Sequence, residues 1–548
     1  MKKSFSILRV LVLITLISTV ILSACSKSND GNTSSSNNSD ANATANQASA
    51  PEELKLKVVI PHFGGDPTGT VVEQQYEKEI EAYMGTKVSI EWTRIPWGEY
   101  REKTQIMLTS GDIPDVMLVL GNDNIVKYGE QGLFLDLNKY AENTPNYSTF
   151  VDATDNKEQY LMTDNDQLFA FYDGYSNPSD IEPSQYAAAY RLDVFEKNNI
   201  KVPTTQEEMY EAAKKLKALY PDSYPIGQSE QYMGYDGILN ANHTSSGIYW
   251  NGTQYVYGPT EDAYKEGLMF LNKLYSEKLI DPAFWSDEID QAKPKATSGK
   301  TFIYPQLWSG YVADFNANKE AGVTWTLAMT ADNPTYGKAW KYGSDPKGKG
   351  LQNGYGIVIS AKTKHPEQVV KLLDYQYSDK MIDLLMWGIE GKSYEVKDGQ
   401  KQYLPALKSA PDFVDQLAKM GVSASMSTRP GIVFTPQERI AVYTSVPDVL
   451  FYHDGKAQLE NYYIASNEYG GSESISPNDR APKVMLSKDE TDEVADTMTP
   501  IDTYVQESAV KFIKGEMGFD QWDNYLATIK KMGDLQAILD LQNSKVKK

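Results

Sequence analysis

Residues 54–120 alternate between strand-like and helix-like hydrophobic patterns, and this alternation restricts the fold more than any other feature of the chain. The expected order is strand, helix, strand, helix, strand, at residues 54–60, 72–84, 86–92, 97–109 and 114–120. In the first helix Val72, Tyr76 and Ile80 share one face. The third strand, "PDVMLVL", is apolar enough to be covered on both sides. This order predicts an α/β fold with a mostly parallel sheet and helices on both faces.

The chain opens with a leader. Basic residues precede an apolar run at residues 10–22, a secretory pattern that is too short to span a bilayer comfortably. The motif "LSAC" at residues 22–25 resembles the lipobox of bacterial lipoproteins. We therefore expect residues 1–24 to be a signal peptide and Cys25 to carry the lipid. Residues 25–52 would be the anchor and its linker, because residues 26–50 contain 7 Ser and 6 Asn and no large apolar side chain.

A second set of elements begins near Tyr186. Amphipathic helices are expected within residues 202–221, 260–281 and 365–379, where apolar residues recur at helical spacing. The first of these has Thr205 and Glu208 at the spacing of a capping box. Removing 24 of the 548 residues would leave 524, which is too many for one compact core. The sequence therefore predicts two α/β lobes.

Charge and cysteine content exclude several classes of protein. The total charge of −21 would become −24 once Lys2, Lys3 and Arg9 leave with the signal peptide, so nucleic acid is a poor partner. Cys25 is the only cysteine, which excludes disulfides and cysteine-bound metal in the folded part. No later stretch of 18 residues is apolar, so no further membrane span is expected.

Motifs for catalysis are weak. The four histidines stand far apart and match no metal-binding spacing. Residues 343–350, "GSDPKGKG", have the spacing of a phosphate loop, but Gly350 replaces the Ser or Thr that would hold magnesium. With 74 acidic residues, a pair of carboxylates is too common to indicate glycoside hydrolysis. We therefore expect no enzyme and no cofactor, and the sequence leaves open whether a structural calcium ion binds.

Aromatic residues next to Gly, Asn or Ser are the strongest indication of a ligand site. A sugar ring has apolar C–H faces and a hydroxyl rim, so its site needs aromatic platforms with polar groups around them. The candidate platforms are Trp97, Trp250, Trp308 and Trp387. Each of them also fits the edge of a core equally well. Arg191 could hold a hydroxyl or carboxylate, with a surface ion pair as the alternative.

Several stretches, in order, resemble the family 1 extracellular solute-binding proteins of ABC importers, which are related to maltose-binding protein. They include "LTSGDIPDVMLV", "GLFLDLNKY", "GKTFIYPQLWSGY" and "WGIEGKSYEV". The tail "YVQESAVKFIKGEMGFDQWDNYLATIKKMG" is similar to the large oligosaccharide-binding branch. The resemblance covers roughly residues 54–540 and rests on order and spacing rather than on one specific motif.

The resemblance implies a two-lobed, type II periplasmic-binding-protein-like fold with the ligand in the cleft between the lobes. We expect lobe 1 at residues 53–172 plus about 322–355, and lobe 2 at 173–321 plus about 356–548. Trp308 takes the position of the family's stacking tryptophan, although "YPQLW" lacks the family's Asn-Gly-Pro before it. The further ligand-binding positions implied, less firmly than Trp308, are Phe63 and Asn122 at strand ends and Tyr232 and Tyr235 in the second lobe.

The function implied is that of a lipid-anchored receptor, a monomer on the outer face of the cell membrane, which captures an oligosaccharide and delivers it to an ABC permease. A surface-anchored glycoside hydrolase, a peptide-binding protein and an adhesive lipoprotein remain alternatives. The sequence does not show which sugar is bound. Scarce arginine makes a highly anionic sugar a poorer candidate than a neutral one, but it stays an alternative because Arg191 and Arg429 could share a cleft.

Overall fold

The computed structural model describes residues 53–62, 65–154, 163, 166–175, 186–228, 236–287, 289–317, 322–341, 350–410, 412–423, 429–433, 439–482, 484 and 486–546. The predictions for the signal peptide, Cys25 and the linker lie outside these residues. So do those for Phe63, Tyr232 and Tyr235. Among the described residues, no helix combines the length and the apolar character that crossing a bilayer requires.

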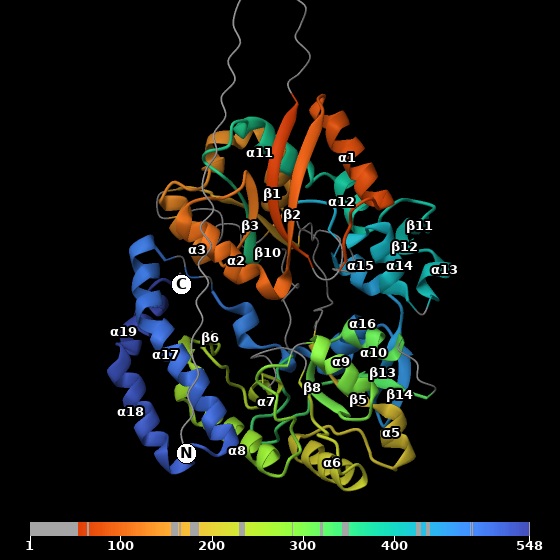
Figure 1. Cartoon of the computed structure of the whole chain (residues 1–548), viewed down its shortest axis with the longest axis vertical. Helices are drawn as coiled ribbons and strands as arrows, with labels where there is room; N and C mark the ends of the chain where they lie inside the picture. The colour runs from red at the N-terminus through yellow and green to blue at the C-terminus, as the bar shows by residue number, and fades with distance from the viewer. Residues whose placement is uncertain are drawn as a thin grey trace, which may run out of the picture. The chain divides into compact units, whose positions relative to one another are not determined.

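Five strands form the first sheet in the order β2-β1-β3-β10-β4 (Figure 1). They are β1 (Leu54–His62), β2 (Val88–Pro96), β3 (Val116–Leu120), β4 (Ala170–Tyr175) and β10 (Gly350–Ile359). β1 pairs in parallel with β2 and β3, which confirms the predicted strand–helix–strand order. β10 is antiparallel to both β3 and β4. The sheet is therefore mixed. Strands β1, β2 and β3 run parallel to one another, as predicted, whereas β10 is antiparallel to its neighbours.

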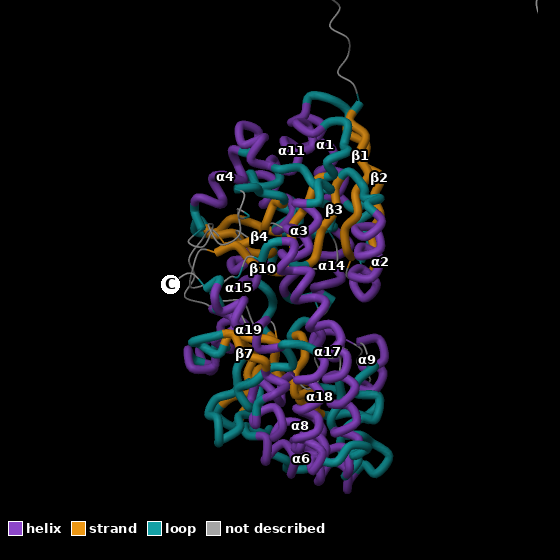
Figure 2. Tube along the Cα trace, turned by 90° about the vertical axis from the view of Figure 1, so that its left-hand side faces the viewer, coloured by secondary structure: helices purple, strands orange, loops and turns teal. Residues whose placement is uncertain are grey.

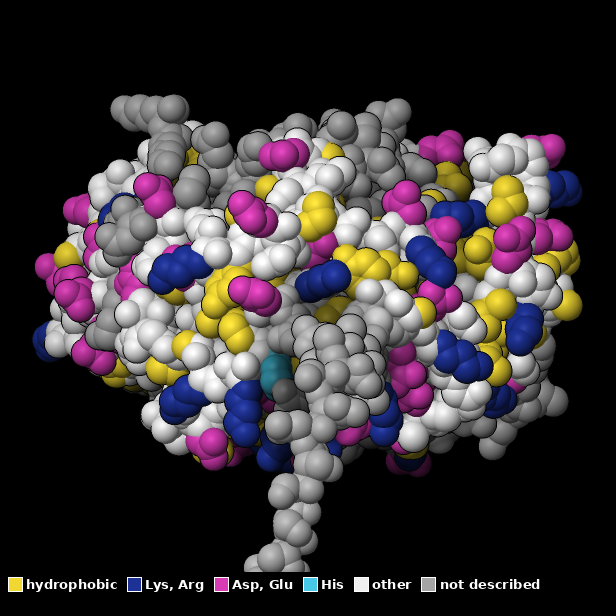
Figure 3. All heavy atoms as spheres, turned by 90° about the horizontal axis from the view of Figure 1, so that it is seen from above, with side chains coloured by type: hydrophobic (Ala, Val, Ile, Leu, Met, Phe, Trp, Pro, Cys, Tyr) yellow, Lys and Arg dark blue, Asp and Glu magenta, His cyan; other side chains and the backbone are white. Residues whose placement is uncertain are grey.

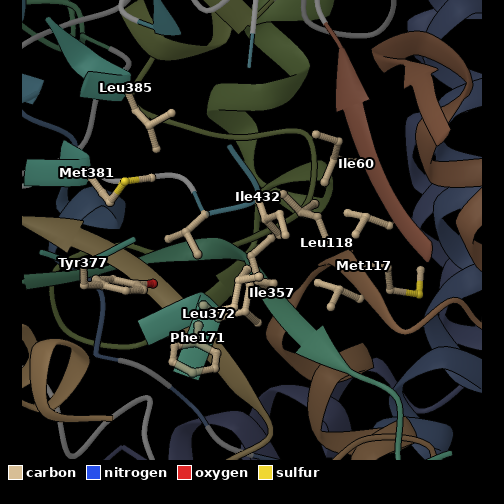
Figure 4. Packing of buried hydrophobic residues seen from close by; sticks show 14 of the residues in the cluster. Ile60, Met117, Leu118, Phe171, Ile357, Leu372, Tyr377, Met381, Leu385 and Ile432 are labelled. Carbon is tan, nitrogen blue, oxygen red and sulfur yellow. The ribbon is translucent and has the colours of Figure 1, made fainter. Parts of the chain in front are cut away.

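Helices cover this sheet on both faces, and all five residues of β3 are buried. Its helices and small hairpin are α1 (Val71–Met84), α2 (Trp97–Ser110), α3 (Asn122–Glu130), η1 (Leu137–Asn143), α4 (Pro145–Asp152), α11 (Pro366–Tyr375), α12 (Asp379–Met386), β11 (Tyr394–Lys397), β12 (Gln400–Tyr403), α13 (Pro405–Lys408), α14 (Phe413–Met420) and α15 (Arg439–Ser445). Figure 4 shows how the core joins distant segments, with Phe171 and Ile357 of the strands near Leu372 and Tyr377.

The second sheet has the strand order β14-β13-β9-β5-β8. Its strands are β5 (Tyr186–Arg191), β8 (Ile303–Trp308), β9 (Trp325–Ala328), β13 (Val449–His453) and β14 (Lys456–Glu460). Residues of β5 alternate between two cores: Ala188 and Tyr190 lie in one, Ala187 and Ala189 in the other. This period-2 alternation shows that the sheet is covered on both faces.

The segments around this sheet are α5 (Leu192–Lys197), α6 (Gln206–Leu219), α7 (Asp236–Ala241), β6 (Ile248–Trp250), β7 (Tyr255–Tyr257), η3 (Gly258–Thr260), α8 (Asp262–Ser276), α9 (Ile289–Thr297), α10 (Tyr311–Ala317), α16 (Tyr462–Gly470), η5 (Ser472–Ser474), η6 (Pro477–Arg480), α17 (Lys488–Lys514), η7 (Phe519–Gln521), α18 (Trp522–Met532) and α19 (Leu535–Ser544). Helix α8 lies beside α17 and α18 although the sequence separates them widely (Figure 2).

Sheet membership differs from the expected lobe boundaries. The sequence-based boundaries place residues 322–355 in the first lobe, but β9 pairs with β5 and β13 in the second sheet. They also place residues 356–548 in the second lobe, whereas α11 and α12 pack in the first core. Those assignments are wrong for β9, α11 and α12. Hydrophobic periodicity shows that an element has a buried face, but not which sheet it covers.

Candidate ligand site

Several strands of the first sheet end at one edge. The parallel strands β1, β2 and β3 end at His62, Pro96 and Leu120. Since β10 is antiparallel to both β3 and β4, β4 runs parallel to β3 and also ends at this edge. Helices α2 and α3 start directly after β2 and β3. In open α/β sheets, ligands bind outside the carboxyl ends of strands, so this edge, called the first edge below, is a candidate site.

The chain connects the first edge to one edge of the second sheet. β5 begins at Tyr186, which lies opposite Trp308 at the end of β8. Ala188 of β5 lies opposite Ala328 at the end of β9. The connection from β4 to β5 therefore starts at the first edge and ends at this second edge, and the connection from β9 to β10 starts at the second edge and ends at the first. Trp308 is thus placed where the two sheets are linked.

Trp308 is half-buried at the end of β8. Its ring meets the ring of Tyr311 edge-on, with centroids 4.9 Å apart. The indole also lies over the backbone of Gly310, where a Cβ atom would collide with it. Gly310 and Tyr311 therefore fix the position of the indole, as a stacking platform requires.

Trp97 is the first residue of α2 and is 43% exposed, an unusual exposure for a tryptophan. Its ring stacks on Tyr100 with centroids 6.4 Å apart and planes 12° apart. Tyr100 is fully buried, and its hydroxyl donates to the carbonyl of Leu118 at 2.8 Å. The first edge therefore presents an exposed aromatic ring on a rigid support.

Asn122 begins α3, directly after the strand end. The hydroxyl of Tyr172, from β4, donates to Asn122 Oδ1 at 2.5 Å. Tyr172 is itself held, because its amide donates to the Tyr147 hydroxyl at 3.0 Å and its carbonyl accepts from Tyr377 at 2.6 Å. The Asn122 side chain is therefore oriented by a buried network.

Charged groups also gather at the first edge. Asp66, in the loop after β1, accepts from the Thr68 hydroxyl at 2.6 Å and the Thr68 amide at 3.0 Å. These bonds, with the charge of Arg94, hold the pKa of Asp66 below its usual range. Arg94 on β2 donates to Glu73 at 2.9 Å and lies over the Trp92 ring at 4.4 Å. Asp66 is thus ionised, and Arg94 is paired.

Asp123 follows Asn122 in the first turn of α3. Its side chain reaches solvent. The protein around it nevertheless removes part of its hydration, and this desolvation raises its pKa. A carboxylate that is exposed but surrounded by protein can accept hydrogen bonds from ligand hydroxyls.

Two predicted ligand residues lie elsewhere. Trp387 is fully buried in the first core, against Tyr403 at a centroid distance of 5.1 Å. Arg191 is also buried, and its guanidinium donates to Asp193 at 2.7 Å and to the Ala296 carbonyl at 3.2 Å. Both side chains serve packing within their lobes, so their assignment to a ligand surface is wrong. Tertiary packing decides the burial of such residues, and local sequence does not reveal it.

Trp250 remains a prediction. It ends β6 and meets Tyr255 edge-on, with centroids 5.3 Å apart. Its amide donates to Asn478 Oδ1 at 2.9 Å. These contacts place it on a separate hairpin and do not connect it with either strand edge.

A small apolar pocket lies inside the second lobe, lined by Ile226, Ile238, Leu271 and Phe284 among others. Gln228 is the one polar side chain in the lining that the structure describes, so the pocket is too apolar to suit the hydroxyls of a sugar. Within the described residues, no group of three His, Cys, Asp or Glu side chains is arranged to hold a metal ion.

Sequence reasoning missed Asp66, Arg94, Asp123 and Tyr172. The first three lie at or beyond the ends of strands β1, β2 and β3. The strand-end rule that selected Asn122 could therefore have selected Asp66 and Asp123 as well. Tyr172 gave no such signal, because its role depends on β4 pairing with β10.

The chain matches the family model described as bacterial extracellular solute-binding protein over residues 67–382. The lipoprotein LipO of Bacillus subtilis is 23% identical over 65% of this chain and 70% of its own. The fructooligosaccharide ABC transporter substrate-binding protein FusA of Streptococcus pneumoniae is 22% identical over 85% of both chains. The crystal structure of the alginate-binding protein AlgQ2 without calcium ion superposes with a TM-score of 0.69, at 18% identity, over 90% of this chain and 98% of its own.

The family match spans more than half of the chain. The structural likeness agrees with an α/β fold built on two mixed sheets and confirms the predicted two-lobed fold. The chain belongs to the bacterial extracellular solute-binding protein family.

Proposed function

We propose that this protein captures an oligosaccharide between its two strand edges and delivers it to an ABC permease. The observation that carries the proposal is the pair of aromatic rings, Trp97 and Trp308, at the edges that the chain connects. Aromatic faces bind the C–H faces of sugar rings, and the polar groups of Asn122, Asp66 and Asp123 suit the hydroxyls. The name of FusA, a fructooligosaccharide-binding relative, supports the same class of ligand.

We infer lobe boundaries that follow the sheets, with residues 53–175 and 350–446 in the first lobe and 186–341 and 447–546 in the second. A ligand that touches both edges would favour a closed form by its differential affinity for that form. Periplasmic binding proteins are themselves an example of such hinge closure. The permease would then recognise the closed form.

The same proposal covers anchoring and assembly. Cys25 would carry the lipid and hold the protein on the outer face of the membrane as a monomer, and the LipO relative is itself named a lipoprotein. Two or more acyl chains provide a stable anchor where one does not. Labelling of the wild-type chain, but not of Cys25→Ser, with a fatty-acid analogue tests this part.

Binding without catalysis is the proposed activity, and a thermal-shift screen tests it. A ligand at 100 times its dissociation constant should stabilise the fold by ~2.7 kcal/mol. We expect the melting temperature to rise with an oligosaccharide and no reducing sugar to be released. A rise with peptides alone, or release of reducing sugar, would contradict the proposal and favour a peptide-binding protein or a glycoside hydrolase.

A further inference from the structure

The names of the relatives leave the charge of the ligand open, because one names fructooligosaccharide and another alginate. The first edge bears on this question. We propose that the site selects uncharged oligosaccharides and rejects polyuronates. The inference rests on the proposed function and concerns the same site.

The helix N-termini at the first edge carry their own counter-charges. A helix N-terminus is a ready site for an anion, because unpaired N–H groups and the helix dipole favour negative charge there. Helices α1, α2 and α3 follow β1, β2 and β3 and so begin near this edge. Each has a carboxylate in its first turn: Glu73, Glu99 and Asp123. Glu73 pairs with Arg94 and Glu99 with Lys103, so the charges of these two pairs cancel, and Asp123 adds a negative charge that a uronate would meet.

The arginine at this edge is already engaged. Arg94 Nη2 donates to Glu73 at 2.9 Å, and both side chains are largely buried. The second Glu73 oxygen accepts from the Gly69 amide at 2.6 Å, which holds the pair in place. Glu73 already balances the charge of Arg94, so a uronate that approached Arg94 would also meet the Glu73 carboxylate. Arg94 therefore supplies little net attraction for an anionic ligand.

Two carboxylates at the same edge lack a basic partner in a salt bridge among the described contacts. Among the described residues, Asp66 accepts hydrogen bonds from Thr68 within its own loop, and Arg94 acts on it through the attraction of its charge. Asp123 lies in the first turn of α3, and desolvation raises its pKa. Both can accept hydrogen bonds from sugar hydroxyls, which are donors, but each repels a second carboxylate.

The sequence segments between β4 and β5 and between β9 and β10 do not offset the negative charge of the first edge. In sequence, residues 176–185 contain Asp180 and Glu182 and no basic residue. Residues 342–349 contain Asp345, Lys347 and Lys349. Their net charges of −2 and +1 sum to −1. Figure 3 shows the face seen from above, where acidic and basic side chains are interspersed among the coloured atoms.

Paired calorimetric titrations test this inference. The purified protein is titrated with neutral fructo-, xylo- and gluco-oligosaccharides and with oligogalacturonate and oligoalginate of equal length. We expect a neutral series to bind and the uronates to bind at least about a hundredfold more weakly, with neutral binding insensitive to salt. Uronates that bind as well as or better than every neutral series would overturn the inference and leave the proposed function standing. Absence of binding to any sugar would sink both.

The double variant Asp66→Asn, Asp123→Asn provides an independent test. Removing two negative charges should reduce the difference in affinity between neutral and uronate ligands by about tenfold or more. Asp496→Asn, an exposed change on α17, is the matched control and should leave this difference unchanged. An unchanged difference in the double variant, with its melting temperature intact, would show that these carboxylates do not set the selectivity.

Discussion

Local packing fixes the ring of Trp308, which is also the ring proposed to stack on the ligand. Its indole can lie over residue 310 only because Gly310 has no side chain. The local backbone thus determines where the platform stands. A platform held in one orientation loses less entropy on binding than a mobile one.

The variant Gly310→Ala should therefore displace the indole of Trp308. We expect oligosaccharide affinity to fall about tenfold, close to the loss from Trp308→Ala, because stacking depends on ring position. Calorimetry measures the affinity, and a melting curve shows whether the fold survives. Gly247→Ala is the control, since its new Cβ would meet no atom within 4 Å. Equal affinities in Gly310→Ala and the wild type would contradict the platform role.

Tyr172 should act on ligand binding through Asn122. The change Tyr172→Phe removes the hydroxyl that orients Asn122 Oδ1 and should weaken binding about threefold to tenfold. In an Asn122→Ala background the same change should have no further effect, because the oriented group is gone. A double-mutant cycle by calorimetry gives the loss of affinity from Tyr172→Phe in the wild-type and in the Asn122→Ala background. Additive losses would mean that Tyr172 affects binding independently of Asn122.

The Tyr257–Asp502 pair gives a pH-dependent prediction. Burial raises the pKa of Asp502, and the bond from the Tyr257 hydroxyl, at 2.7 Å, partly lowers it. Tyr257→Phe should raise this pKa further. Between the ordinary and the raised pKa the folded state binds more protons than the unfolded state, so stability falls as pH rises.

The stability lost in Tyr257→Phe should thus be about 1–3 kcal/mol near pH 8 and smaller near pH 4, because the raised pKa of Asp502 brings its protonation closer to that pH. Urea denaturation at both values measures it. Tyr403→Phe is the control, because its hydroxyl donates to the Met386 carbonyl, which does not titrate in this range. Equal costs of Tyr257→Phe at the two pH values would contradict this account.

At the scale of elements, start signals of helices were readable from the sequence. The Thr205 hydroxyl accepts from the Glu208 amide at 3.2 Å at the start of α6, as its spacing predicts. The Glu208 carboxylate accepts its closest backbone hydrogen bond from the Thr204 amide, at 2.8 Å. A reciprocal capping box is present instead at Ser487 and Glu490 of α17.

Thr205→Ala should cost about 1 kcal/mol of stability, because one N–H of the first turn loses its acceptor. Thr205→Ser keeps the hydroxyl and should cost only a few tenths of that amount. Urea denaturation measures both variants at the same pH. If the two variants lost the same stability, the cap would contribute nothing and α6 would depend on packing alone.

The order of the first three strands was predictable because neighbouring elements in sequence pair in space there. The places of β9, β10 and β13 were not, since each pairs with strands far away along the chain. Periodicity carries no information about such partners. For the same reason, the exposed Trp97 and the buried Trp387 were indistinguishable in sequence.

At the scale of the whole molecule, function depends on connections between two sheets that each have their own core. The chain leaves the first sheet after β4 and returns to it at β10, always at the edges that carry the aromatic rings. The resemblance to solute-binding proteins implied this arrangement, whereas local patterns implied only two α/β lobes. The proposed ligand must therefore touch both edges.

Hydrogen–deuterium exchange with and without a bound oligosaccharide tests this claim most directly, because it locates the ligand on both sheets at once. We expect added protection in peptides that contain residues 65–70, 96–100 and 120–124 of the first edge, and also 306–312 of the second. Protection confined to one edge, or located away from both, would contradict it.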